Sequence, residues 1–216
     1  MKTTRRISFH IVSIALLWLL GSVMTATGVA FAQEGQEDRD HSREQRDEGR
    51  DHFRGKWDFA KVVDMRIAAP GGTGTASAEN GSRITLTGGG TFDLPSGRVT
   101  GGGTWQTQDP SGAITGSGEY RVRSFVSWTL SAGSLSCPPF GDILGNCEDA
   151  RGGLLVLVVD YLDGTEGVLK FSCRLFGAPE SMFEGVTMSK GFVDYWKHEK
   201  VNIDDSNCAI HVHFLK

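Results

Sequence analysis

A glycine-rich element that recurs three times constrains the fold of this chain more than any other feature. Gly88-Gly89-Gly90-Thr91-Phe92 is repeated as Gly101-Gly102-Gly103-Thr104-Trp105, and a degenerate third copy is Gly116-Ser117-Gly118-Glu119-Tyr120. The copies are separated by Pro-Ser-Gly turn sequences, so the repeat predicts consecutive antiparallel hairpins. Glycines inside strands mark bends, bulges or close backbone approach, which are the devices that curl a sheet into a barrel.

Strand patterns continue on both sides of this repeat. Large apolar residues alternate with polar ones from Trp57 to Ile67, as in a half-buried strand. Glu119 to Leu130 alternates in the same way, which predicts one shared face for Tyr120, Val122, Val126, Trp128 and Leu130. Further strands are predicted at Leu154–Val159, Gly167–Phe176, Met182–Met188 and Ala209–Leu215. The stretches Pro70–Ser82 and Ser131–Gly153 are predicted loops, and a short helix is an option for Gly191–Val201.

These patterns together predict an all-β domain over residues 57–216. We expect a Gly-rich antiparallel meander of about eight or nine strands, with little helix, that closes into a single β-barrel. Ahead of this domain, residues 33–56 are almost entirely charged or polar. They predict a disordered linker, with a charged single helix as the alternative.

The N-terminus has the three-part pattern of a secretory signal peptide. A basic stretch from Lys2 to Arg6 precedes an apolar run from Ile11 to Leu20, and Ala30-Phe31-Ala32 supplies the small residues of a cleavage site. Residues 1–32 are therefore the predicted signal peptide, with cleavage after Ala32. The apolar run is shorter than the roughly 20 residues that span a bilayer, so we expect no stable membrane span after cleavage; an uncleaved anchor is the alternative.

The mature chain is predicted to be acidic and to reside outside the cytoplasm. Cleavage removes three basic and no acidic residues from 22 Lys+Arg and 26 Asp+Glu, which leaves a formal net charge of −7. Such a chain lacks the basic surface of nucleic-acid-binding proteins, so nucleic acid is not an expected partner. A secreted or periplasmic location follows from the leader.

The four cysteines fit an oxidising compartment. Two disulfides are expected, and among the three connectivities we prefer Cys137–Cys147 and Cys173–Cys208. The alternative of a four-cysteine zinc site has no C-x-x-C pair to support it. His211 and His213 share one face of a predicted strand, which fits either two surface residues or the start of a metal site; no metal or cofactor is predicted.

Aromatic residues are the best candidates for a binding site. Trp105, Tyr120 and Trp128 are predicted to line the interior of the barrel, where rings bind apolar or sugar-like ligands by burial and stacking. There is no G-x-S-x-G nucleophile motif, and the glycine clusters are not followed by the Gly-Lys-Ser/Thr of a phosphate loop. No catalytic residue is therefore predicted.

The strand rhythm over Trp57–Lys216 resembles that of exported small β-barrels, namely the allene oxide cyclase/dirigent-like and lipocalin/avidin-like types, and the chain looks like bacterial secreted proteins of unknown function. The lipocalin G-x-W motif is absent, so no site residue is transferred. The resemblance implies a barrel that binds a small apolar or sugar-like ligand. A barrel enzyme of the isomerase or cyclase type and a structural or interaction protein of the cell envelope are the alternatives, and the oligomeric state is open.

Overall fold

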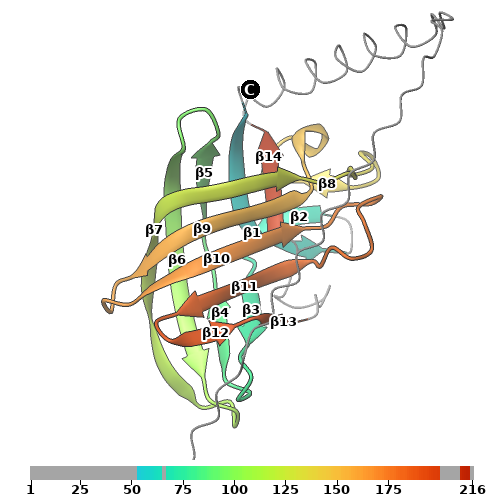
Figure 1. Cartoon of the computed structure of the whole chain (residues 1–216). Coiled ribbons are helices and arrows are strands. Elements are labelled where there is room, and N and C mark those ends of the chain that lie inside the picture. The colour runs from blue at the N-terminus through green and yellow to red at the C-terminus, as the bar shows by residue number, and fades with distance from the viewer. Residues whose placement is uncertain (1–52, 65–66, 200–209, 215–216) are drawn as a thin grey trace, which may run out of the picture. The chain divides into compact units, whose positions relative to one another are not determined.

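The computed structural model describes residues 53–64, 67–199 and 210–214 (Figure 1). These residues are almost all β, as predicted, with one 3-10 turn, η1 (Cys147–Asp149), but they form fourteen strands where eight or nine were predicted, because several strands are only two to four residues long. The strands are β1 (Arg54–Val63), β2 (Ile67–Pro70), β3 (Gly74–Ser77), β4 (Arg83–Leu86), β5 (Gly89–Asp93), β6 (Arg98–Gln108), β7 (Ile114–Leu130), β8 (Gly141–Asp142), β9 (Gly153–Tyr161), β10 (Glu166–Cys173), β11 (Gly185–Lys190), β12 (Val193–Tyr195), β13 (Lys197–His198) and β14 (Ile210–Phe214). The predicted signal peptide and residues 33–52 of the predicted linker lie outside the described residues. Residues 53–56, also predicted as linker, belong to the domain, since Phe53 is buried in the core and β1 begins at Arg54.

All fourteen strands belong to one sheet. Its main path runs β12-β11-β10-β9-β7-β6-β5-β1-β2-β8, and only the β2–β8 pair is parallel. The long strand β6 pairs first with β5 and then with β4, so that β4, β3 and β13 form a branch of the sheet. β14 pairs with β1. The three glycine-rich copies lie on β5, β6 and β7, which are consecutive antiparallel strands, and this part of the prediction is confirmed.

β5 and β6 pair glycine against glycine, with Gly89 opposite Gly102 and Gly90 opposite Gly101. At Gly101 the backbone has φ +136°, and a Cβ there would lie 2.5 Å from the Gly89 oxygen and 2.7 Å from Cζ2 of Trp57. A Cβ on Gly103 would lie 1.9 Å from the Thr87 oxygen. Only glycine allows this approach, and it lets the sheet bend where β6 passes from β5 to β4.

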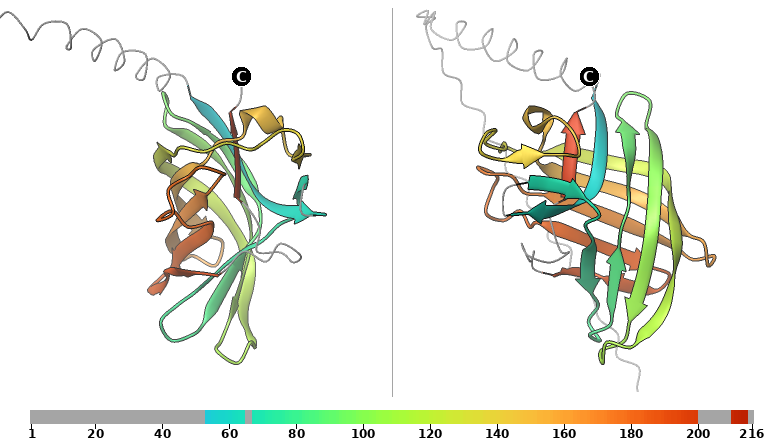
Figure 2. Two further views of the ribbon diagram at one scale, coloured as in Figure 1. Left: turned by 90° about the vertical axis from the view of Figure 1, so that its right-hand side faces the viewer. Right: turned by 180° about the vertical axis from the view of Figure 1, so that it is seen from behind.

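The bend brings distant strands of the sheet face to face. Figure 1 shows β9, β10 and β11 crossing in front of β1, β3 and β4. Trp57 and Phe59 of β1 lie 4.7 Å and 4.9 Å, between ring centroids, from Phe171 of β10, although four strands separate β1 from β10 in the sheet. The core lies between these two layers, which the left-hand view of Figure 2 shows from the side. Its largest fully buried side chains are those of Trp57, Tyr120, Tyr161, Phe59, Phe92, Phe171, Ile84, Leu86, Leu155, Leu157 and Leu169.

The sheet is curled but not closed within the described residues, so the finer prediction of a barrel is not confirmed. β11 and β3 meet through side chains, because a Cβ on Gly74 would lie 2.5 Å from Cγ1 of Val186. No ladder joins these two strands in the part of the chain that the structure describes. Instead β12 pairs with β11 and β13 pairs with β3, with only Trp196 between them.

Local predictions failed where strands are short or bulged. Pro70–Ser82 is not a loop throughout, because it contains β3, and Gly191–Val201 contains β12 and β13 where a helix was one option. The alternation of β7 is interrupted by register shifts between Val122 and Ser124 and between Phe125 and Ser127. Val126 is therefore exposed, while Phe125 and Trp128 pack against the core, and Leu130 is exposed as the last residue of β7.

Replacing Gly101 by alanine should destabilise the domain by about 3 kcal/mol or more, because it adds a backbone and indole clash to the strain of positive φ. Gly97→Ala is the matched control, since Gly97 also has positive φ (+64°) but has no atom within 4 Å of its Cβ position. It should cost about 1 kcal/mol. Chemical denaturation measures both, and equal losses would contradict the close-packing account.

Candidate functional site

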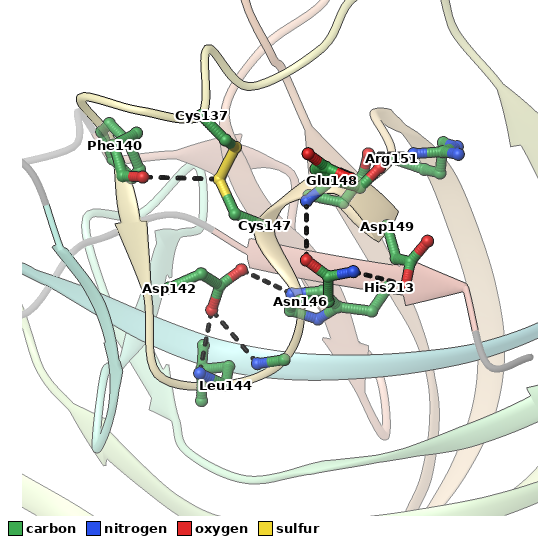
Figure 3. Close-up of a disulfide and its surroundings, with 12 residues drawn as sticks. Cys137, Phe140, Asp142, Leu144, Asn146, Cys147, Glu148, Asp149, Arg151 and His213 are labelled. Atoms are coloured by element: carbon green, nitrogen blue, oxygen red, sulfur yellow. Dashed lines mark hydrogen bonds and ion pairs between the residues drawn. A yellow bond between two sulfur atoms is a disulfide. The ribbon is translucent and has the colours of Figure 1, made fainter.

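A disulfide-closed segment covers one end of the β1–β14 pair. Cys137 and Cys147 form a disulfide with 6.1 Å between their Cα atoms, so the first preferred pairing is confirmed (Figure 3). Within the loop, Asp142 on β8 accepts hydrogen bonds from the backbone N–H groups of Leu144 and Gly145. Its other carboxylate oxygen lies 2.6 Å from Nε2 of His213 on β14. The side chain of Asp142 is fully buried and that of His213 is 3% exposed, so this pair anchors the loop to the sheet.

Of the two interpretations of His211 and His213, surface residues or the start of a metal site, the first is wrong for His213, whose ring is buried beneath the loop. The side chain of His211 lies outside the described residues. Within the described ranges, no group of three His, Cys, Asp or Glu side chains is arranged to hold a metal ion. Cys173 is buried and carries no disulfide in the structure, and burial raises the pKa of its thiol well above its usual value. Cys208 lies outside the described residues, so the Cys173–Cys208 pairing stays a prediction.

The structure brings two of the three predicted aromatic site residues together and separates the third. Trp105 and Tyr120 both contact Tyr161, with ring centroids 5.9 Å and 6.2 Å away. Trp128 lies elsewhere, between Phe53 and Phe92. Trp105 and Tyr120 are almost completely buried and Trp128 is partly buried, so all three are packed into or against the core. Whether they contact a ligand stays a prediction.

Lys190 lies over the rings of Trp105 and Tyr161 at one end of the core. Its ammonium lies 4.2 Å from the ring centroid of Trp105 and 4.9 Å from that of Tyr161. It also donates to the Asp163 carboxylate and, at 2.8 Å, to Oγ1 of Thr165. The hydrogen bond from Lys190 holds the pKa of Asp163 below its usual value, and burial raises the pKa of both Tyr120 and Tyr161. The tyrosines are neutral, and their hydroxyls donate to the backbone oxygens of Thr87 and Ser189.

A polar depression lies on the opposite face of the same strands. It has a volume of about 530 Å³, is shallow and open to solvent, and is lined by residues of β4, β6 and β7, by Thr87 just after β4 and by Thr73 just before β3. These strands are nearest the viewer in the right-hand view of Figure 2, where they run from teal to yellow-green. Seven of its nine lining residues have polar side chains; the full lining is Thr73, Thr85, Thr87, Thr104, Trp105, Gln106, Ser117, Gly118 and Glu119.

The strand registers arrange these polar side chains in two rows, which we call the hydroxyl rows. In the first row Gln106 lies opposite Thr85 on one side and Ser117 on the other. In the second row Thr104 lies between Thr87 and Glu119, and Thr73 extends this row from the residue before β3. The Oγ1 atoms of Thr87 and Thr104 are 2.7 Å apart. Because side chains alternate along each strand, one face carries the core residues and the other carries hydroxyl, amide and carboxylate groups.

No protein family, curated protein or solved structure matches this chain. Within the described residues, no helix is long and apolar enough to cross a membrane. The site must therefore be judged from its own chemistry.

The hydroxyl rows were not predicted from the sequence, although a signal for them is present there. Thr85-Leu86-Thr87, Thr104-Trp105-Gln106 and Ser117-Gly118-Glu119 each place two polar residues around a core residue. That spacing predicts two polar residues on the outer face of each strand. It does not show which strands are neighbours, because the β4–β6 pairing skips β5.

Lys190→Met should lower the free energy of unfolding by about 1–2 kcal/mol, chiefly through the lost cation–π contacts, since the Asp163 carboxylate is largely solvated. The lowered pKa of Asp163 stabilises the fold above about pH 4, its usual range, and this contribution is lost as the pH falls through the lowered value. The variant should therefore lose less stability than the wild type on acidification below pH 4. Thermal unfolding across pH tests this, with exposed Lys170→Met as the control. A flat difference with pH would contradict the assigned partner of Lys190.

Asp142→Ala should cost about 3 kcal/mol, because it removes one member of a buried, hydrogen-bonded carboxylate–imidazole pair. Asp109→Ala is the control, since Asp109 also accepts from backbone N–H groups, at Ser111 and Ala113, but in an exposed turn. Hydrogen exchange should show faster exchange across residues 131–152 in the first variant alone. Unchanged protection there would show that the pair does not anchor the loop.

Proposed function

We propose that this chain is an exported, non-enzymatic binding protein whose domain takes a polyhydroxylated, sugar-like ligand on the hydroxyl rows. The observation that carries the proposal is the open depression of about 530 Å³ lined by seven polar side chains, which come from β4, β6, β7 and the residues beside β3 and β4.

The chemistry of the two faces favours a sugar-like ligand over an apolar one. On the inner face Trp57, Phe171 and Leu157 have almost no exposed surface, so these side chains pack against other core residues and leave no apolar surface for a ligand. On the outer face an apolar ligand would contact the threonine methyl groups but would strip water from hydroxyl, amide and carboxylate groups without replacing their hydrogen bonds. A polyhydroxylated ligand replaces those hydrogen bonds, and the threonine methyl groups offer contact to the C–H faces of a sugar ring.

The threonine pair at the centre keeps hydrogen-bonding capacity for a ligand. A hydroxyl has one donor and two acceptor positions. In the Thr87–Thr104 pair one hydroxyl donates to the other, and Oγ1 of Thr87 also accepts from the backbone N–H of Thr104. The pair thus retains one donor and the remaining lone pairs of Thr104, which lie on exposed surface. Such a fixed pair loses little side-chain entropy on binding.

We also propose that export places the domain outside the cytoplasm and that the curled sheet acts as a barrel-like ring. The leader pattern and the Cys137–Cys147 disulfide support export to an oxidising compartment. The continuous segment 193–198, which pairs with β11 and then with β3, supports the ring. A ring would shield the edges of β11 and β3, which otherwise invite association with other strands.

The double substitution Thr87→Val/Thr104→Val should weaken glycan binding by about tenfold or more, since it removes the central hydroxyls and keeps shape and strand propensity. Binding is measured by calorimetry against a panel of neutral oligosaccharides, after a screen of the mature protein on a glycan array.

Thr91→Val/Thr100→Val is the matched control. These residues form the same kind of cross-strand hydroxyl pair, 2.8 Å apart, on β5 and β6 but outside the depression. The control should bind like the wild type. Equal losses in both variants, or no glycan bound by the wild type, would contradict the proposal and favour a structural or interaction protein of the envelope.

A further inference from the structure

The hydroxyl rows are longer across the strands than along them. The second row runs from Thr73, just before β3, past Thr87, just after β4, to Thr104 on β6 and Glu119 on β7, and three strand spacings of about 4.8 Å make it about 14 Å long. The two rows are separated by two residues along each strand, which is only about 7 Å. A bound molecule that uses the whole depression therefore has its long axis perpendicular to β4 and β6.

The backbone positions along the second row are evenly spaced, because Thr87, just after β4, Thr104 on β6 and Glu119 on β7 are neighbours across the sheet. The hydroxyls of Thr87 and Thr104 lean together to 2.7 Å and form one polar group, with the Glu119 carboxylate one strand further on. A repeating ligand whose hydroxyls recur once per unit meets a protein group at every strand. A single compact ring meets only one or two of these groups and leaves the remainder to water.

The row has no cation to recognise an acidic glycan and no exposed aromatic ring to stack on a single sugar. Its lining groups are hydroxyls, one amide and the Glu119 carboxylate, and the one aromatic lining residue, Trp105, is buried with its ring beneath Gly116 and Gly118. The indole N–H of Trp105 is used internally, since it donates to the backbone oxygen of Glu119 at 3.1 Å. Recognition would thus proceed by hydrogen bonds spread along the row.

We propose that the ligand is an unbranched, neutral polysaccharide that lies across β3, β4, β6 and β7 and is bound along its length, not at a chain end. This inference rests on the proposed function and specifies its ligand class. Glu119 then acts as a specificity residue for long chains, because it is two strand spacings, about 10 Å, from Thr87, and a chain of three or more units spans that distance.

The test titrates the mature full-length protein with β-1,4-linked glucose and N-acetylglucosamine oligomers of one to six units. Affinity should rise by about three- to tenfold per unit up to three or four units and then level off, as each unit adds about one hydrogen bond. Glu119→Ala should reduce the affinity for the tetramer by about three- to tenfold and leave that for the dimer within about twofold. Glu79→Ala, at an exposed position outside the depression, should change neither.

The outcomes separate this inference from the proposed function. If monomer and tetramer bind equally well and the binding remains sensitive to Thr87→Val/Thr104→Val, the polymer inference is wrong and the sugar site stands. Equal effects of Glu119→Ala on dimer and tetramer would likewise overturn it. If no oligomer binds in a way that depends on Thr87 and Thr104, both proposals fail.

Discussion

The close approach of β5 and β6 at their paired glycines is the constraint on which the remaining structure depends. Gly90 and Gly101 face each other across the ladder, and the indole of Trp57 lies directly over Gly101. Any side chain there would strike backbone or indole atoms. Because the strands approach so closely, β6 leaves β5 and continues beside β4, and the sheet turns back on itself. The large ring of Trp57 then reaches Phe171 on the far layer.

Because of the same bend, one face of the sheet is buried in the core and the other is exposed to solvent. The inner face is closed by its own side chains, from Phe171 at the centre to the Lys190 ammonium over Trp105 at one end. At the other end the disulfide loop is held by Asp142 and His213. The outer face of β3, β4, β6 and β7 lies opposite this packed core and presents the hydroxyl rows on strands that the core holds in place. Rigid elements beneath a polar face favour binding by preorganised groups.

The sequence predicts the all-β class and the three-strand repeat well, since both depend on local patterns. Leu154–Val159 is a predicted strand, and β9 forms there between β7 and β10. The face of Val126 is predicted wrongly, because the first bulge in β7 shifts the alternation before Val126 and the second restores it before Trp128, and a bulge has no signature in residue hydrophobicity. The candidate site was only partly predictable. Trp105 was chosen as an aromatic and lies next to the depression, but the hydroxyl rows depend on β4 pairing with β6, a contact set by the path of the chain and absent from any local pattern.

We propose that the protein fills its own interior and binds its ligand on the outer face. Methyl-detected NMR separates these two places, because the threonine methyl groups lie on the outer face of β4 and β6 and the leucine methyl groups of β9 and β10 lie in the core. On titration with a β-1,4-linked tetrasaccharide, the methyl signals of Thr85, Thr87 and Thr104 should shift and those of Leu155, Leu157 and Leu169 should stay in place. Shifts confined to the interior leucines, with unchanged threonine signals, would contradict the account and restore a ligand inside the curled sheet.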